Sequence, residues 1–143
     1  MTSIVFCGVG DVRTIDLPRH RRDDGEIVVA EVGAKAPFAI ARMFMVRGSL
    51  GAERGKHAHR LCSQLMLCVH GAIEVICADG REQRTFTLDR SNLALLVPPT
   101  IWNSVIFRKM DSVLVVLCDR PYEEHDYIRE YPEFLKFRKA VAS

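Results

Sequence analysis

The feature that most constrains the fold is a succession of short apolar segments, with a turn signal about every ten residues. The segments are rich in Val, Ile, Phe and Leu, and they span residues 27–32, 38–46, 64–70, 72–78, 85–88, 93–97, 104–108 and 113–118. Asp79-Gly80 lies between two of them and predicts a tight hairpin. Because no helix fits between consecutive segments, the pattern predicts an all-β antiparallel sandwich or small barrel.

Helical character is confined to the C-terminal part of the chain. Residues 122–131 carry acidic residues early and Arg129 late, a charge order that suits the dipole of a short helix. Pro132 suits the first turn of a second helix, which is expected to extend to residue 141. Tyr127 and Tyr131 are expected to anchor this tail on the barrel.

Composition excludes several classes of function. With 143 residues, 48% of them hydrophobic and 27% charged, the chain has the size and balance of one globular domain. A net charge of +2 gives no broad basic surface for nucleic acid or acidic lipid. The apolar segments are too short to cross a bilayer, and the N-terminus lacks the pattern of a secretory signal. These features predict a cytoplasmic protein.

The five cysteines form no Cys-x-x-Cys pair and are odd in number. In a cytoplasmic chain this usage is typical of buried small side chains rather than of a disulfide framework.

His57 and His59 are the first candidate functional residues. Residues two apart on a strand project from the same face, so both imidazoles are expected side by side. Such a pair suits either metal binding or proton transfer near neutral pH. An isolated His-x-His is also compatible with histidines that only form hydrogen bonds in a core or at a surface.

The spacing around these histidines resembles the first motif of the cupin superfamily. Five residues separate the leading glycine from His-x-His, four more precede a polar residue, and six more precede a second glycine: Gly51, His57, His59, Gln64 and Gly71. Gln64 stands where the cupin motif has an acidic metal ligand. Residues 98–103 are similar to the second motif, with Asn103 in place of its histidine. The resemblance implies a cupin double-stranded β-helix, or jelly roll.

These two replacements argue against a metal in the expected pocket. Transition-metal sites in proteins use imidazole together with carboxylate or thiolate. Two imidazoles with the neutral amides of Gln64 and Asn103 make a poor donor set. We therefore expect no metal and no cofactor there, and histidines that are free for acid–base chemistry.

A closer resemblance extends over most of the chain, from about residue 24 to 135. The segments PFAIARMFMV, RGKHAHR, QLMLCVHG and LLVPPTIW, and above all the tail YEEHDYIREYPEFL, are similar to the WxcM-like, FdtA/QdtA-type sugar-nucleotide 3,4-ketoisomerases. The resemblance implies a metal-free isomerase, usually a homodimer, acting on a dTDP-linked 4-keto-6-deoxyhexose. Such enzymes supply 3-keto sugars for the deoxyamino sugars of surface polysaccharides such as lipopolysaccharide O-antigen. It also implies one cupin domain over residues 1–143, with the barrel at about 25–120 and the tail at 121–143.

The resemblance assigns roles to particular residues. His57 and His59 are the expected acid–base pair, with His59 favoured as the main base. The expected substrate-binding residues are Arg42, Arg54, Gln64, Trp102, Asn103 and Phe44. Either arginine suits a diphosphate or keto oxygen, although each also suits a solvated surface. Trp102 suits stacking on base or sugar, although a lone Trp in a barrel also suits its core.

Two departures from the family pattern leave alternatives open. The family commonly has His at the position of Asn103 and Tyr at the position of Phe44. Both differences lie at expected pocket positions. A non-catalytic cupin that binds a sugar nucleotide and a metal-dependent cupin enzyme therefore remain as alternative functions.

Overall fold

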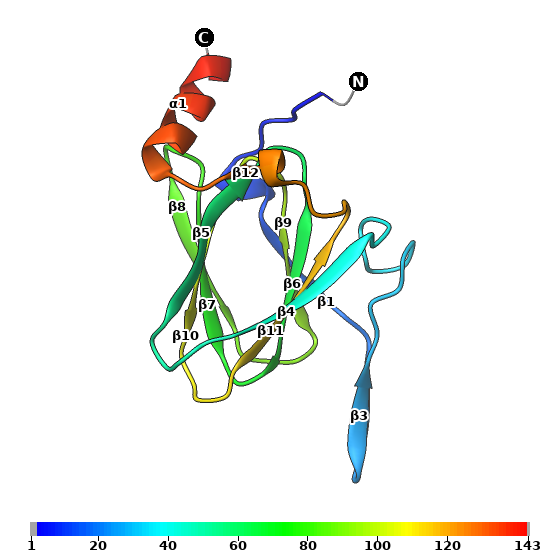
Figure 1. The fold of residues 1–143 in the computed structure, drawn as a ribbon. Helices are drawn as coiled ribbons and strands as arrows, with labels where there is room; N and C mark the ends of the chain where they lie inside the picture. The colour runs from blue at the N-terminus through cyan, green and yellow to red at the C-terminus, as the bar shows by residue number, and fades with distance from the viewer. Residues whose placement is uncertain (1–2, 143) are drawn as a thin grey trace.

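Two five-stranded sheets face each other in the computed structural model, which describes residues 3–142 (Figure 1). The first sheet has the order β1 (Arg13–Asp16), β9 (Leu93–Val97), β6 (Gln64–His70), β11 (Val113–Cys118) and β4 (Arg42–Arg47). The second has the order β12 (Tyr127–Ile128), β5 (Glu53–His59), β10 (Trp102–Phe107), β7 (Ile73–Ala78) and β8 (Gln83–Leu88). Neighbouring strands within each sheet are antiparallel.

This architecture confirms the prediction of an all-β jelly roll. Three strands of the two sheets were not expected from apolar runs. β1 lies before residue 25, β12 has only two residues, and β5 contains Glu, Arg, Gly and Lys where a buried strand would have apolar residues. β5 nevertheless pairs with β10 and β12. Pairing with these neighbouring strands, rather than the amino-acid composition of β5, fixes the strand conformation of this segment.

The main core lies between the two sheets and follows the alternation of side chains along each strand. On β11, for example, Leu114, Val116 and Cys118 are buried against the facing sheet. Phe107 and Leu95 are fully buried in the same cluster. Four of the five cysteines are buried and all five are free, in agreement with the expected role as small core side chains: Cys7, Cys62, Cys68, Cys77 and Cys118.

The turn predicted at Asp79-Gly80 is built as expected, and Gly71 shows why the cupin-like motif ends in glycine. The loop between β7 and β8 is a hairpin in which the Asp79 carboxylate accepts hydrogen bonds from the backbone N–H groups of Arg81 and Glu82, both at 2.8 Å. Gly71, the last glycine of the cupin-like motif, has φ +84° and lies against Ser112, where a β-carbon would collide. The motif therefore requires glycine at this position.

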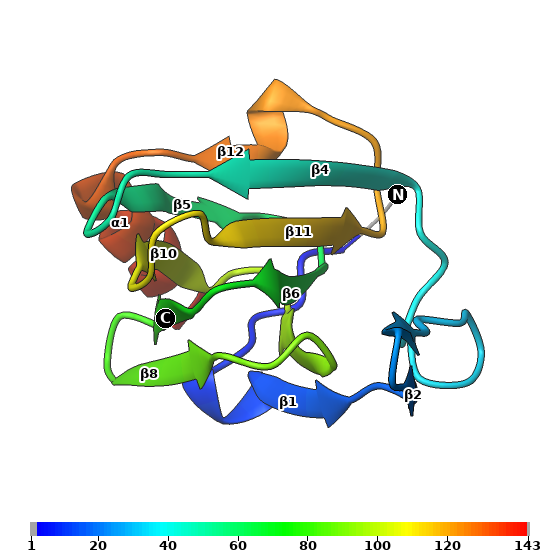
Figure 2. The same ribbon diagram turned by 90° about the horizontal axis from the view of Figure 1, so that it is seen from below.

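A second, smaller hairpin projects from the barrel. β2 (Arg19–Arg22) and β3 (Gly25–Val28) pair only with each other, and Figure 1 shows them extending away from the two sheets. A short 3₁₀ helix, η1 (Val9–Asp11), precedes β1 and contributes the buried Val9. Seen from below, β4 and β12 lie on the same side of the barrel (Figure 2).

The tail differs from its prediction. The helix expected over residues 122–131 is wrong: this segment forms the 3₁₀ helix η2 (Glu124–Asp126) and then β12. Pairing of Tyr127 with His59 and of Ile128 with Ala58 on β5 outweighs the local helical preference. The second helix is confirmed as α1 (Tyr131–Ala142), with Pro132 in its first turn. Over residues 3–142, no helix is long and apolar enough to cross a membrane.

Candidate active site

His57 and His59 lie side by side at the end of β5. Their ring centroids are 5.0 Å apart and their planes are nearly perpendicular, at 87°. The prediction that both imidazoles share one face is therefore confirmed. A β-bulge opposite Asn103 precedes the pair, with Gly55 at φ +85° and Lys56 at φ +59°. A bulge re-aims the following side chains, and here it precedes the two histidines directly.

The side chain of Asp126 holds His59 in place. The His59 ring is 4% exposed, and its Nδ1 donates a hydrogen bond of 2.8 Å to Oδ2 of Asp126. The other carboxylate oxygen accepts the backbone N–H of Leu61 at 2.6 Å. Although burial opposes the charged form, the hydrogen bonds from His59 and from the backbone lower the pKa of Asp126. An ionised carboxylate only accepts hydrogen bonds, so Nδ1 carries a proton, and in the neutral form of the ring Nε2 is the acceptor.

Tyr127 joins this pair to the wall of the barrel. Its ring lies 4.3 Å from that of His59 and 5.1 Å from that of His57, measured between centroids. Its hydroxyl accepts a hydrogen bond of 3.0 Å from Nη2 of Arg42. Tyr127 therefore does more than anchor the tail, which was its expected role.

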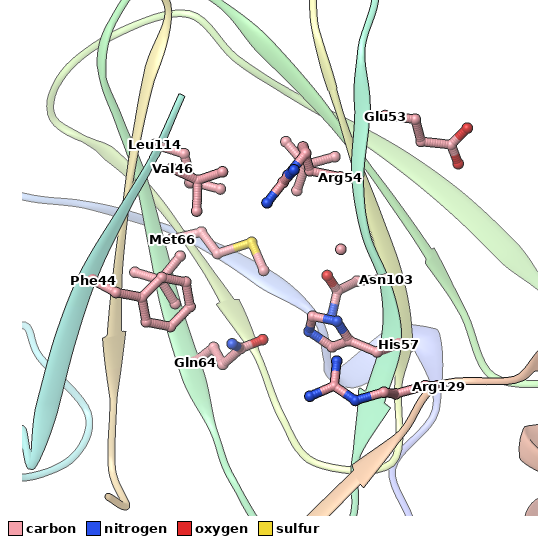
Figure 3. Close-up of a pocket in the computed structure, with 13 residues that line it drawn as sticks. Phe44, Val46, Glu53, Arg54, His57, Gln64, Met66, Asn103, Leu114 and Arg129 are labelled. Atoms are coloured by element: carbon pink, nitrogen blue, oxygen red, sulfur yellow. The ribbon is translucent and has the colours of Figure 1, made fainter. Parts of the chain in front are cut away.

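A cavity of about 330 Å³ opens beside His57, between the two sheets (Figure 3). This volume is at the small end of the range for ligand sites in proteins. Four predicted substrate-binding residues line it together with His57: Phe44, Arg54, Gln64 and Asn103. Further lining residues were not predicted, and among them Val46, Met66, Leu114 and Val116 make one wall apolar, whereas Arg129 and Glu53 are charged.

Buried polar atoms around the cavity lack partners. Among the described residues, Nδ1 of His57, Nε2 of His59, Oε1 of Gln64 and Nδ2 of Asn103 are buried without a hydrogen bond. A buried polar atom without a partner costs about 1–3 kcal/mol, so native proteins keep few of them. This group offers both donors and acceptors, and it therefore fits a polar ligand such as a sugar.

The two histidines differ in electrostatics. Burial, together with the charge of the neighbouring His59, lowers the pKa of His57 to about 4. The His57 ring is thus neutral near pH 7 and a weak proton acceptor.

Three predicted site residues are not among those that line the cavity: His59, Trp102 and Arg42. Trp102 stacks edge-on against Tyr131, with centroids 5.1 Å apart, and also contacts Phe134 of α1. Trp102 and Asn103 are consecutive on β10, so their side chains take opposite faces, and only Asn103 turns inward. Trp102 therefore does not line this cavity, and its role in substrate binding stays a prediction. Arg42 does not line the cavity either and reaches the histidines only through Tyr127.

Sequence reasoning missed Asp126, Tyr127 and Arg129 as site residues. Arg129 lines the cavity, lies 4.3 Å above the Tyr127 ring, and forms an ion pair with Glu124 at 2.9 Å. All three belong to the tail that carries the family resemblance, and this was the one signal pointing to them.

The cavity residues do not fit a cupin metal centre. At the four positions where cupins place metal ligands, the chain has His57, His59 and the neutral side chains of Gln64 and Asn103. Neither amide can become anionic, so the set lacks the carboxylate or thiolate that such sites normally use. We derive no chemical step through a metal in this cavity.

Comparison with known proteins identifies the family. A family model described as FdtA, WxcM-like, C-terminal, matches residues 10–139. The chain belongs to this family. The family resemblance predicted from the sequence is thereby confirmed.

Relatives of the FdtA-family chain include proteins of known activity. This chain is 36% identical over 114 residues to TDP-4-oxo-6-deoxy-α-D-glucose-3,4-oxoisomerase of Aneurinibacillus thermoaerophilus. The match covers 79% of this chain and 82% of the oxoisomerase. A 3,4-ketoisomerase from Helicobacter canadensis superposes with a TM-score of 0.86 at 27% identity, over 90% of this chain and 98% of the other. The WlaRB TDP-quinovose 3,4-ketoisomerase of Campylobacter jejuni superposes with a TM-score of 0.82 at 26% identity, over 88% and 98%. These homologues are sugar 3,4-ketoisomerases, which confirms the isomerase class predicted from the sequence.

Proposed function

We propose that this chain moves a keto group between C4 and C3 of a nucleotide-linked 4-keto-6-deoxyhexose, with TDP-4-keto-6-deoxyglucose as the model substrate. The names of its relatives support the reaction and the TDP-sugar class. The observation that carries the proposal is the paired imidazoles beside a cavity whose buried polar atoms lack partners. A sugar that presents a ketone and a neighbouring hydroxyl supplies the missing partners.

His59 is the base in this proposal. The reaction removes the proton at C3, and the C3–H electron pair forms the C3=C4 double bond while the O4 carbonyl becomes an oxyanion. With its Nδ1 hydrogen held by Asp126, His59 accepts this proton at Nε2. The Asp126 carboxylate then stabilises the imidazolium, as the buried aspartate does in hydrolytic triads.

The enediolate needs hydrogen-bond donors fixed beforehand. The Nδ2 group of Asn103 is buried and free, and Arg129 brings a positive charge to the same cavity. Donors already in place stabilise developing negative charge without reorganisation. Return of the proton to C4 and loss of the O3 hydrogen then give the 3-keto sugar. Because it stays neutral, His57 is suited to relay protons and to hydrogen-bond with the substrate rather than to act as the main base.

The remaining lining residues are suited to holding the sugar nucleotide. Gln64 offers a free amide oxygen to a sugar hydroxyl. Phe44 and Met66 form an apolar wall that suits the C6 methyl group of a 6-deoxy sugar. Arg54 is exposed and lines the same cavity, where it suits the diphosphate.

Oligomeric state, location and pathway are further parts of the proposal. The outer face of the sheet at β4 exposes Met43 and Met45, and Val69 on β6 is exposed as well. An apolar face at an edge strand suits contact with a second copy of the chain, so we infer a homodimer. We also infer one domain over residues 1–143 that acts in the cytoplasm, in the synthesis of deoxyamino sugars for surface polysaccharide.

The test is incubation with TDP-4-keto-6-deoxyglucose in D₂O, followed by NMR of the sugar. We expect deuterium at C3 and C4 and accumulation of the 3-keto product. Without exchange and without product, the proposal fails for this substrate. If the sugar nucleotide binds in isothermal titration calorimetry but does not exchange, the non-catalytic binding cupin becomes the better description. Asn103 and Phe44 are the residues that would favour that second function.

A further inference from the structure

Three potential metal ligands, none of which lines the cavity, lie together around His59. One donor atom each from His59, Cys62 and Asp126 lies within 4.8 Å of the other two. All three residues are buried. They come from three segments, namely the end of β5, the loop that leads to β6, and η2.

This donor set differs in kind from that of the cavity. It combines an imidazole, a thiol and a carboxylate, all of which are ligands in protein zinc sites. A second thiol, that of Cys118, is close enough to Cys62 to influence the pKa of the Cys62 thiol. Sulfur donors favour soft or borderline cations such as Zn²⁺ over Mg²⁺ or Ca²⁺. The proposed reaction uses neither cysteine.

We propose that His59, Cys62 and Asp126 bind a zinc ion, and that this ion inhibits the enzyme. Zinc lies about 2.0–2.3 Å from nitrogen, oxygen and sulfur ligands, so a tetrahedral site requires donor atoms that are now up to 4.8 Å apart to close by about 1 Å. Cys62 lies on a loop and Asp126 in a single 3₁₀ turn, and both segments are short enough to make this adjustment. The ion replaces the proton between Nδ1 of His59 and Asp126.

The Cys62 thiol also has a partner when no ion is bound. Its Sγ donates a hydrogen bond of 3.4 Å to the carbonyl oxygen of Ser63, so the buried thiol proton is satisfied in the metal-free protein. Zinc then displaces this proton, as it does from coordinating thiols in general.

Inhibition follows from the position of His59, and this part of the inference rests on the proposed function. With zinc on Nδ1, the ring loses its hydrogen bond to Asp126, and the adjacent cation opposes the positive charge that His59 must accept at Nε2. Binding of the ion itself does not depend on the proposed reaction.

The binding test uses cobalt as a spectroscopic substitute for zinc. We expect one equivalent of Co²⁺ to give the near-ultraviolet thiolate-to-cobalt charge-transfer band, and one equivalent of Zn²⁺ to abolish it. Cys62→Ser is expected to lose this band and to weaken zinc binding by about tenfold or more. Absence of the band in the wild-type protein, or its persistence in Cys62→Ser, would overturn the proposal.

Two variants guard against misfolding as an explanation. Cys77→Ser alters a fully buried thiol of the main core that is not one of the three ligands, and it is expected to keep the band. Asp126→Asn leaves Cys62 in place and is expected to weaken zinc binding, with far-ultraviolet circular dichroism as the check on folding. Loss of the band in Cys77→Ser would mean that the signal reports folding rather than ligation, and would count against the site.

The inhibition test compares activity with and without one equivalent of zinc. Zinc is expected to stop deuterium exchange in the wild-type protein and to leave Cys62→Ser active at the same concentration. If the metal-free protein does not catalyse exchange at all, the proposed function has failed while the cobalt result still decides the site. If the metal-free protein is active and stoichiometric zinc does not inhibit it, the inhibitory role is wrong.

Discussion

His57 and His59 differ in their contact with the cavity and in the hydrogen bonding of Nδ1, although a single residue separates them on β5. His57 borders the cavity, its Nδ1 has no partner, and its pKa is lowered to about 4. His59 is buried behind it, and its Nδ1 is held by Asp126. Identical side chains on one face of a strand thus become unequal through what the tail places against them. The motif supplies two imidazoles, and η2 and β12 give them different partners, because Asp126 of η2 is hydrogen-bonded to His59.

Substitution of each histidine by alanine, one at a time, gives the largest expected effect on the rate of deuterium exchange. His59→Ala removes the proposed base, and general base catalysis is typically worth about 10²–10⁴-fold in rate. We expect kcat for deuterium exchange to fall by that factor while binding of TDP, measured by calorimetry, changes little. His57→Ala is expected to raise KM as well, because His57 lines the cavity. If His57→Ala loses more kcat than His59→Ala, the assignment of the base is reversed.

The low pKa of His57 predicts a contribution to stability that depends on pH. Its folded pKa of about 4 lies below the usual histidine value of 6.5, so between these pH values the unfolded chain binds a proton that the folded one does not. The free energy of unfolding therefore falls as the pH decreases from 6.5 to 4, by up to about 3 kcal/mol from this group. Urea denaturation of His57→Gln at both pH values is expected to show a correspondingly smaller decrease. An unchanged pH dependence would mean that His57 is not desolvated in solution.

The support that Asp126 gives to His59 predicts a smaller effect on rate. Asp126→Asn keeps the shape of the side chain but offers no negative charge to the imidazolium, and we expect kcat to fall by about 10–100-fold. Asp119→Asn is the matched control, because Asp119 also anchors the loop before β6 by accepting the Ser63 N–H at 2.9 Å. Equal losses in the two variants would mean that Asp126 only holds the loop.

Most of the framework was predictable from the sequence. Apolar runs with regular turn signals predicted the strands that form the core, and the spacing from Gly51 to Gly71 predicted a pair of histidines on one face. β5 itself was harder to predict from composition, because a strand that borders a cavity carries polar residues and glycine. Its identification depended on the motif.

The errors have physical causes. The charge order of residues 122–131 describes a helix in isolation, but pairing of Tyr127 and Ile128 with β5 replaces it by a strand. The contact of Asp126 with His59 joins residues 67 positions apart, and no local pattern encodes such a contact. The absence of Trp102 from the cavity wall was predictable, because alternation along β10 places its side chain on the face opposite to that of Asn103.

Substitution of Tyr127 gives the smallest expected effect on the difference between His57 and His59, because the Tyr127 ring contacts both histidines. Tyr127→Phe keeps both ring contacts and removes only the hydroxyl that accepts from Arg42. A hydrogen bond of this kind contributes about 0.5–1.5 kcal/mol, so we expect a change of a few-fold in kcat and little change in the melting temperature. Tyr127→Ala removes the ring that contacts both His57 and His59, and it is expected to lower kcat and the melting temperature much more than Tyr127→Phe does. If Tyr127→Phe alone abolishes exchange, the phenol takes part in proton transfer, and the division of roles between the two histidines has to include it.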